Sequence, residues 1–406
     1  MALSTKVTSF RYTAGSTADI VLSGWGFQPK FLILHWCGAD SATDTVGAGN
    51  INHGWGLGTS SSDQRCASHR STTGGAAGAG ATYHRNDAIV VVADDAAVLD
   101  GYFVLSTMDA GGATLTVPDS ISINLTVMVV AVGGTDIAKA ATGQDTDHTV
   151  AGANKSYSGL PFGGDVPDFM FFVAAIDANT TPPGGSGSED GISFGVAKAS
   201  GAGSQYVVEA AQDDGSANID SASYIFDNEF LVGSTASNPL SILARKQFVS
   251  MDANGFTWNQ LELPQTAGSI FHFLAIKGGQ WSVGDLLTQT DTTTTVTESA
   301  QPGQPSLIIM ASANRAKSTQ DTGTAHGQVS FGAATSTTER MAMAIQNENG
   351  TANAECSTAI EYDAIYANIS ASDVIQGLGD INAINSDGFG FIMDDADPAQ
   401  SFAWWV

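Results

Sequence analysis

The sequence predicts an all-β protein built from three tandem antiparallel β-sandwich domains, jelly-roll-like and related by an internal repeat of about 138 residues. Two observations predict this class. Short apolar or alternating runs, such as KFLILHW and AIVVVA, are bounded throughout by Gly, Asn, Asp and Ser, which is typical of β-sandwiches. Turn signals also recur at a nearly constant spacing along a 406-residue chain that is too long for one ordinary core.

The first marker of the repeat is a glycine-containing turn and a proline placed directly before an apolar run. Proline fixes φ and donates no backbone hydrogen bond, so it marks the point where a turn ends and a strand begins. The three prolines are Pro29, Pro167 and Pro305, whose separations are 167 − 29 = 138 and 305 − 167 = 138. Equal separations of this length indicate a repeated unit rather than chance.

Three further markers keep nearly the same spacing. A small-residue run ends in glycine, an acidic or amide turn enters an apolar strand, and a glycine turn leads into the closing strands. In chain order these markers fall at Gly58, Gly195 and Gly332, at Asp87, Asn228 and Asp363, and at Gly112, Gly255 and Gly388. Their spacing drifts by a few residues, as loops of variable length allow.

Units of this length are long enough to be domains. Solenoid repeats of roughly 20 to 50 residues depend on their neighbours, but a unit of roughly 140 residues can bury a core of its own. We therefore expect domains at residues 1–140, 141–280 and 281–406, each able to fold independently. Helical structure is expected only as a brief turn near SASDVIQGLG, residues 370–379.

The charge balance excludes two classes of partner. Only 15 Lys and Arg stand against 41 Asp and Glu, which gives a formal net charge of -26. A field of this sign repels phosphate backbones and anionic lipid headgroups, so neither nucleic acid nor a membrane is expected as a partner. The same charge favours a solvated surface that resists aggregation.

The cysteines and the amino-terminal segment indicate where the protein is made. Cys37, Cys66 and Cys356 are odd in number and widely scattered, which argues against a disulfide framework and for a reducing cytosol. The segment MALSTKVTSFRYTAG has no apolar stretch of signal-peptide length, and no segment approaches the roughly 20 apolar residues of a membrane span. We therefore expect synthesis in the cytoplasm without an export signal.

Two motifs that resemble catalytic or zinc sites are interpreted as structural. Ser193 stands in GISFG, a match to the nucleophile elbow, but the corresponding positions read GWGLG and QVSFG and no helical pattern follows. His53, Cys66, His69 and His84 lie close together in the sequence without the usual spacing of zinc ligands, and they are expected in surface loops.

Carboxylate runs are interpreted as solvated turns. The runs DTD at 145–147 and DDADP at 394–398 lack the regular alternation of an EF-hand loop, so no calcium site is predicted there. A pair of carboxylates for glycoside hydrolysis can lie far apart in a chain, and nothing in this sequence singles out such a pair. No catalytic residue, metal or cofactor is therefore predicted.

Aromatic side chains in glycine-rich loops are the best candidates for contact with a ligand, because their amphipathic rings suit sugar and protein surfaces alike. Trp25 and Trp55 are flanked by glycines, and we predict that these two residues and the nearby His53 form a binding surface. Trp36 and Trp404 lie inside apolar strands and are expected in the core. The remaining aromatic candidates for such a face are Trp258, Trp281 and Trp405.

The order of these motifs resembles a β-sandwich domain common in virion proteins of tailed bacteriophages. In that family a GF-x-P-x-hydrophobic entry precedes a D-G-F turn and a closing strand that ends in Gly-Gly. The first unit matches with GFQPKFLILHW and AVGG, and the second with GDVPDFMFFVA, NGFTWN and AIKGG. The third lacks the phenylalanine before its proline and the final glycines. The resemblance implies residence in a virion, and it carries over no catalytic motif.

These observations lead us to expect a non-enzymatic structural protein on the outer surface of a tailed-phage virion, where it decorates or stabilises the capsid or the tail. Its expected partners are the major capsid or tail proteins and further copies of itself. The sequence has no sustained heptads for a trimerising shaft, which favours a compact part docked on the particle. The alternative is a tail-tip or fibre-associated host-attachment protein that binds cell-surface glycans, and the rival class is a glycan-degrading enzyme.

Overall fold

The computed structural model describes residues 3–71, 81–94, 98–175, 184–185, 189–213, 221–235, 241–263, 269–315, 327–348, 355–370 and 373–406. Within these ranges every regular element is a β-strand, and all paired strands are antiparallel, so the predicted all-β antiparallel class is confirmed. Residues 375–379, expected in a helical turn, belong to the strand β30 (Ile375–Asn385). The described residues contain no helix with the length and apolarity that crossing a membrane requires.

The first unit, residues 3–134, is a sandwich of a large and a small sheet. The large sheet has the order β1-β11-β3-β5-β6-β7, with β1 (Leu3–Tyr12), β3 (Pro29–Trp36), β5 (Ile51–Ser60), β6 (Asp63–Ser71), β7 (Ala81–Arg85) and β11 (Leu125–Gly134). The small sheet has the order β2-β10-β9-β8, with β2 (Ile20–Leu22), β8 (Val90–Ala93), β9 (Leu99–Asp109) and β10 (Gly112–Asp119).

The second unit, residues 137–278, has the same strand order. Its large sheet runs β12-β22-β14-β16-β17-β18, with β12 (Ile137–Thr146), β14 (Phe169–Ala175), β16 (Glu189–Ala197), β17 (Gln205–Asp213), β18 (Ser221–Phe226) and β22 (Ile270–Gly278). Its small sheet runs β13-β21-β20-β19, with β13 (Asn154–Tyr157), β19 (Leu231–Thr235), β20 (Ser241–Asp252) and β21 (Gly255–Glu262).

The third unit, residues 284–406, repeats the order again. Its large sheet runs β23-β32-β25-β26-β27-β28, with β23 (Gly284–Leu287), β25 (Ile308–Ser312), β26 (Gly327–Ala334), β27 (Arg340–Asn347), β28 (Cys356–Glu361) and β32 (Phe402–Trp405). Its small sheet runs β24-β31-β30-β29, with β24 (Val296–Glu298), β29 (Tyr366–Ile369) and β31 (Gly388–Asp395) beside β30. The chain passes from one unit to the next at residues 134–137 and 278–284.

Two short strands cross from one unit to another. β4 (Thr45–Ala48) leaves the first unit and pairs with β28 at the edge of the third unit's large sheet. β15 (Gly184–Gly185) leaves the second unit and pairs with β7 at the edge of the first unit's large sheet. Each crossing strand covers an edge whose backbone groups would otherwise be open to another chain. The units are therefore joined by backbone hydrogen bonds as well as by side chains.

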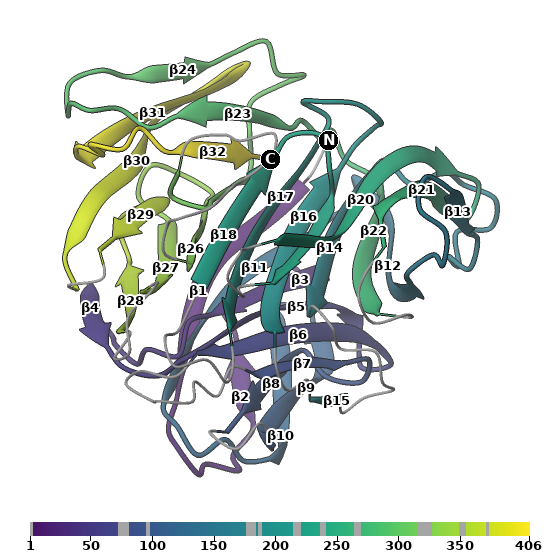
Figure 1. Cartoon of the computed structure of the whole chain (residues 1–406), viewed down its shortest axis with the longest axis horizontal. Helices are drawn as coiled ribbons and strands as arrows, with labels where there is room; N and C mark the ends of the chain where they lie inside the picture. Colours follow the sequence, from purple (N-terminus) through teal and green to yellow (C-terminus); the bar gives the residue numbers. More distant parts are fainter. Residues whose placement is uncertain are drawn as a thin grey trace.

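The large sheets of all three units enclose one hydrophobic cluster, which we call the central core. Its larger members include Phe31, Trp55 and Met128 of the first unit, Phe171, Phe194 and Val208 of the second, and Ile309, Phe331 and Trp404 of the third. The small sheets lie on the outside, with the first unit at the bottom of Figure 1, the second at the right and the third at the upper left. The inner face of every large sheet is thus buried against the other two units.

Burial on both faces explains the apolar run KFLILHW. Along β3, Phe31 and Ile33 lie in the central core. The alternate residues Leu32 and Leu34 lie between the two sheets of the first unit. A strand that is covered on both sides has no polar face, so its sequence reads as a continuous apolar run instead of an alternating one.

Three aromatic rings, one from each unit, meet inside the central core. The ring centroids of Trp55 and Phe194 are 5.2 Å apart in a stacked arrangement. Phe331 lies edge-on to both, with centroids 6.2 Å from Trp55 and 5.2 Å from Phe194. Stacked and edge-to-face pairs at these distances are the favoured geometries of aromatic rings. The expectation that each unit folds independently is therefore not supported, because a separated unit would expose this apolar face to water.

A glycine follows each of the three rings and sets the distance between the two sheets of its unit. A Cβ on Gly56 would collide with the carbonyl oxygen of Ile89, and a Cβ on Gly195 would collide with that of Phe230. In the third unit Gly332 stands in the same relation to Ile365. The repeat marker in the first unit is thus Gly56 rather than Gly58, since Gly56 holds the structural position of Gly195 and Gly332.

We predict that Gly195→Ala lowers the free energy of unfolding by about 2–3 kcal/mol, because the added methyl group forces the backbone of Phe230 away from β16. Urea unfolding measures the change. Gly111→Ala is the matched control, since a Cβ at Gly111 has no neighbour within 4 Å. Equal losses in the two variants would contradict the close approach.

Candidate functional site

The residues predicted to form a binding surface do not lie on one. Trp55 is 0% exposed in the middle of β5, where it stacks on His35 and Phe194. His53 lies on the same strand and the same face, also fully buried, with its ring edge-on to Trp55. The expectation of an exposed glycine-rich loop is wrong here, because the glycines of this segment belong to a strand that approaches other backbone closely.

Trp25 also belongs to the core of its unit. It is 9% exposed, and its ring lies 6.4 Å from that of Phe27. Its backbone N–H donates to the carbonyl of Gly111 at 3.0 Å, which fixes the segment before β3 onto the hairpin of β9 and β10. A ligand therefore has little access to the indole.

The other sequence motifs are likewise structural. Ser193 is buried inside β16, and its hydroxyl accepts a hydrogen bond from the N–H of Val232 at 3.4 Å. No strand-to-helix turn carries it. Cys66, His69 and His84 are buried in β6 and β7, so their expected position in surface loops is wrong. All three cysteines are buried, and none of them forms a disulfide.

The carboxylate runs are only partly the solvated turns that were expected. Asp145 lies 2.6 Å from the ammonium group of Lys155, and the buried Asp147 lies 2.7 Å from that of Lys246. Asp397 is fully buried and accepts hydrogen bonds from the hydroxyls of Thr288 (2.7 Å) and other neighbours. Protein groups therefore already pair with the carboxylates of Asp145, Asp147 and Asp397.

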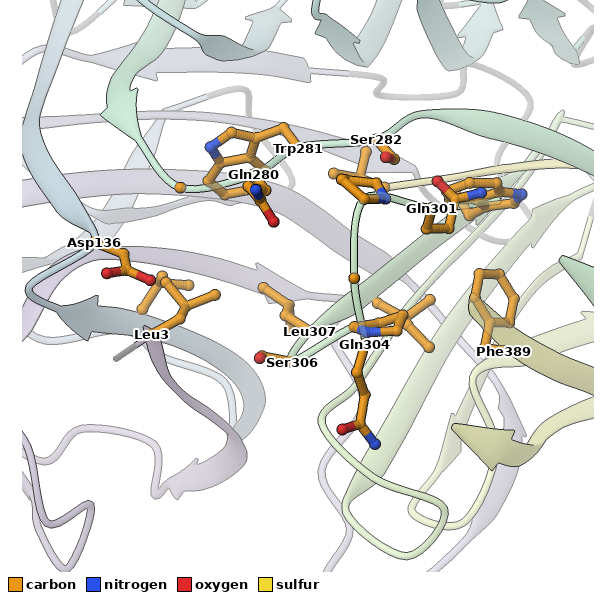
Figure 2. Close-up of a pocket in the computed structure, with 18 residues that line it drawn as sticks. Leu3, Asp136, Gln280, Trp281, Ser282, Gln301, Gln304, Ser306, Leu307 and Phe389 are labelled. Carbon is orange, nitrogen blue, oxygen red and sulfur yellow. The ribbon is translucent and has the colours of Figure 1, made fainter. Parts of the chain in front are cut away.

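The described residues do form a surface cavity, at the place where the connections between units meet. It has a volume of about 360 Å³ and is bordered by the start of β1, the end of β32, and residues of the segments 134–137, 279–283 and 301–307. Figure 2 shows Trp281 and Gln280 at the top of the cavity, with Asp136 and Leu3 at the left. Leu307 and Ser306 lie below Gln280. This size lies at the lower end of the range for small-molecule sites.

The apolar part of the cavity rests on a fixed indole. The Trp281 ring stacks on Phe169 with centroids 4.7 Å apart, and its Nε1–H donates to the carbonyl of Gly278 at 2.8 Å. These two contacts hold the ring in place, so its remaining surface is a rigid apolar patch toward the cavity. Phe389 and Leu307 supply further apolar lining.

The polar part of the cavity consists mostly of side-chain amides. Gln280 and Gln304 are exposed, and among the described residues neither side chain has a hydrogen-bond partner. Gln301 is held by a hydrogen bond from Nε2 to the carbonyl of Ser299 at 3.2 Å. Asp136 is the only carboxylate among the described residues that line the cavity. The arrangement offers donors and acceptors next to an aromatic face, but not two facing carboxylates.

The comparisons with known proteins assign no family to the chain. No protein-family model matches it, and no curated protein matches it. Among solved structures, the LG1-3 region of the laminin alpha2 chain is similar over 100% of this chain and 95% of the laminin chain, at 10% sequence identity and a TM-score of 0.12. A TM-score this low carries no inference about fold or function.

Sequence reasoning missed the cavity because its lining comes from segments that are far apart in the chain. Trp281 was one of several aromatic candidates, and nothing local distinguished it from Trp55. Only its place in the chain could have singled out Trp281 as a site residue. It follows the glycine pair that ends the second unit, so it lies in a connection between units. Connections carry ligand contacts more often than strands do.

The buried histidines carry a cost that depends on pH. Burial lowers the pKa of His69 from 6.5 to about 3. Burial, together with His69 and His35, also lowers the pKa of His53 well below its usual value. No described group forms a hydrogen bond with either ring nitrogen of His53. The folded protein therefore holds these rings neutral.

We predict that His53→Leu reduces sensitivity to acid. Histidine in the unfolded chain takes up a proton below about pH 6.5, whereas buried His53 in the folded protein does not. Protonation therefore favours the unfolded chain, and the free energy of unfolding decreases as the pH falls below that value. The loss of unfolding free energy between about pH 7 and pH 4.5 should be roughly 2–3 kcal/mol smaller in the variant. Urea unfolding at both pH values measures this. An unchanged difference in His53→Leu would contradict the prediction.

Proposed function

We propose that this chain is a non-enzymatic structural protein of a tailed-phage virion, docked on the outer surface of the capsid or tail. The observation that carries the proposal is the central core, in which one polypeptide builds a body of three similar sandwiches. Related sandwiches around a common centre present related loops and edges to neighbouring subunits, which suits a position where several copies of a lattice protein meet. The motif order that resembles virion β-sandwich domains supports the same setting.

Two features support a structural role over catalysis. The crossing strands β4 and β15 cover sheet edges, which is a device against uncontrolled association of β proteins. Asp136 is the single carboxylate among the described residues that line the cavity. Most glycoside hydrolases need a pair of carboxyl groups, one on each side of the bond that breaks. Both features fit a stable, passive component of a particle.

The copy number of the protein in purified particles tests this proposal. We expect hundreds of copies per particle, measured by quantitative mass spectrometry against the major capsid protein as an internal reference. A number between three and a few dozen would place the protein at the tail end and favour attachment. Absence from purified virions would overturn the proposal, and so would reproducible depolymerisation of host polysaccharide by the pure protein.

A second candidate function is attachment to host-surface glycans through the cavity. The observation that favours it is the fixed Trp281 indole beside the unpartnered amides of Gln280 and Gln304. Sugar rings stack their C–H faces on aromatic rings, and side-chain amides bind hydroxyl groups. This function would apply to a tail-end location.

Binding of host polysaccharide fragments to two variants tests this candidate. We expect Gln280→Ala and Asp136→Asn each to weaken binding about tenfold, which corresponds to about 1.4 kcal/mol, measured by isothermal titration calorimetry. Both side chains lack structural hydrogen bonds among the described residues, so the fold should be unaffected. Asp19→Asn, which is outside the cavity lining, is the control. Equal binding by wild type and both variants would exclude the cavity as the site.

A further inference from the structure

Three carboxylates meet at the contact between the first unit's crossing strand and the third unit. Asp44 directly precedes β4, and Glu361 ends β28. With Asp363 they place one oxygen each so that all three lie within 4.8 Å of one another. The sequence separates Asp44 from Glu361 by 361 − 44 = 317 residues, so only the crossing of β4 onto β28 brings them together.

The backbone holds this arrangement in place. The register pairs Thr45 with Ile360, so Asp44 stands opposite Glu361 at the end of the two-stranded contact. The Asp44 Oδ1 atom accepts a hydrogen bond from the N–H of Tyr362 at 2.7 Å. The Tyr362 hydroxyl donates to the carbonyl of Ser41 at 2.6 Å, which fixes the segment that leads into β4.

Glu361 is a buried carboxylate without a partner. It is 5% exposed, and among the described residues no hydrogen bond or ion pair reaches its side chain. Burial, followed by the charges of Asp44, Asp363 and Asp395, raises its pKa to about 7. Arg340, two residues before the strand partner of Glu361, does not relieve this, because it is bound to the carboxylate of Asp380 at 2.5 Å and to the backbone carbonyl of Asp363. A buried anionic group of this kind is costly unless a cation compensates it.

In the first unit the equivalent position holds an arginine that pairs with the carboxylate two residues later. Strand register places Arg85 opposite Cys66 and Gly56, just as Glu361 stands opposite Ala342 and Gly332. Arg85 donates from Nε and Nη2 to the carboxylate of Asp87, both at 2.9 Å. Asp87 corresponds to Asp363 in the repeat. The third unit therefore keeps the carboxylate but has Glu361 in place of the cationic partner.

We propose that Asp44, Glu361 and Asp363 bind a calcium ion that fastens the first unit's crossing strand to the third unit. Calcium prefers oxygen ligands at 2.3–2.6 Å in flexible geometry, so oxygens of one shell lie up to about 4.8 Å apart. The separations between the three carboxylates fit that limit. An all-carboxylate set selects a hard cation over zinc, and the irregular contributions of two strands suit calcium better than the strict octahedron of magnesium.

Calcium titration of the full chain, freed of metal with EDTA, tests the proposal. We expect one calcium ion per chain by isothermal titration calorimetry, with a Kd of about 10⁻⁵ to 10⁻³ M, and a rise in the melting temperature on saturation. Glu361→Gln and Asp44→Asn should each weaken affinity at least tenfold. Asp387→Asn removes the same charge from an exposed turn of the third unit and should bind as wild type does.

Two readouts separate a calcium site from a merely structural acidic cluster. In EDTA, Glu361→Gln should melt above the wild type because the like-charge repulsion is gone, and its melting temperature should no longer respond to calcium. Amide exchange in Thr45–Ala48 should slow on calcium addition in the wild type only. Absence of binding at millimolar calcium, unchanged affinity in both variants, or magnesium binding as tight as calcium would overturn the proposal. None of these outcomes depends on where the protein sits on a particle.

Discussion

The contact among Trp55, Phe194 and Phe331 is the constraint on which the rest of the structure depends. Each ring is followed by a glycine that lies against the backbone carbonyl of the residue directly before a small-sheet strand of the same unit. One short strand segment thus sets two distances at once, from its ring to the other units and from its glycine to the outer sheet. Because both faces of each large sheet are buried in this way, the units behave as parts of one body instead of beads on a chain.

The sequence predicted the strands because their signals are local. Pro29 begins β3 as expected, and the markers Gly112, Gly255 and Gly388 prove to be residues where a Cβ would collide with a carbonyl of the neighbouring strand. The same signal caused the error at Trp55. Glycines on both sides of a tryptophan resemble a loop, but in this segment they belong to β5 and leave room for the outer sheet. Glycine spacing alone does not distinguish a turn from a close approach of two backbones.

The sites proposed for ligands were beyond the reach of local patterns. Asp44 and Glu361 meet because a strand leaves its own unit, and the cavity beside Trp281 exists because the connections between units converge at one end of the central core. Both depend on how the units are arranged around one another. No hydrophobic period or turn motif encodes that arrangement. The inner face of each sheet would have the same apolar sequence pattern if the sandwich packed against any other surface.

A trimer of identical subunits has the same residue at all three equivalent positions. Joining three similar units in one chain allows these residues to differ. Strand register places His53, Ile192 and Val329 two residues before the three central rings. It likewise makes Arg85, Phe226 and Glu361 equivalent. A symmetric trimer with Glu361 at all three positions would bury three unpaired carboxylates, whereas this chain buries one and has an ion pair or an aromatic ring elsewhere. Covalent linkage also removes the entropic cost of association, and it allows the acidic contact to join the first unit to the third alone among the described residues.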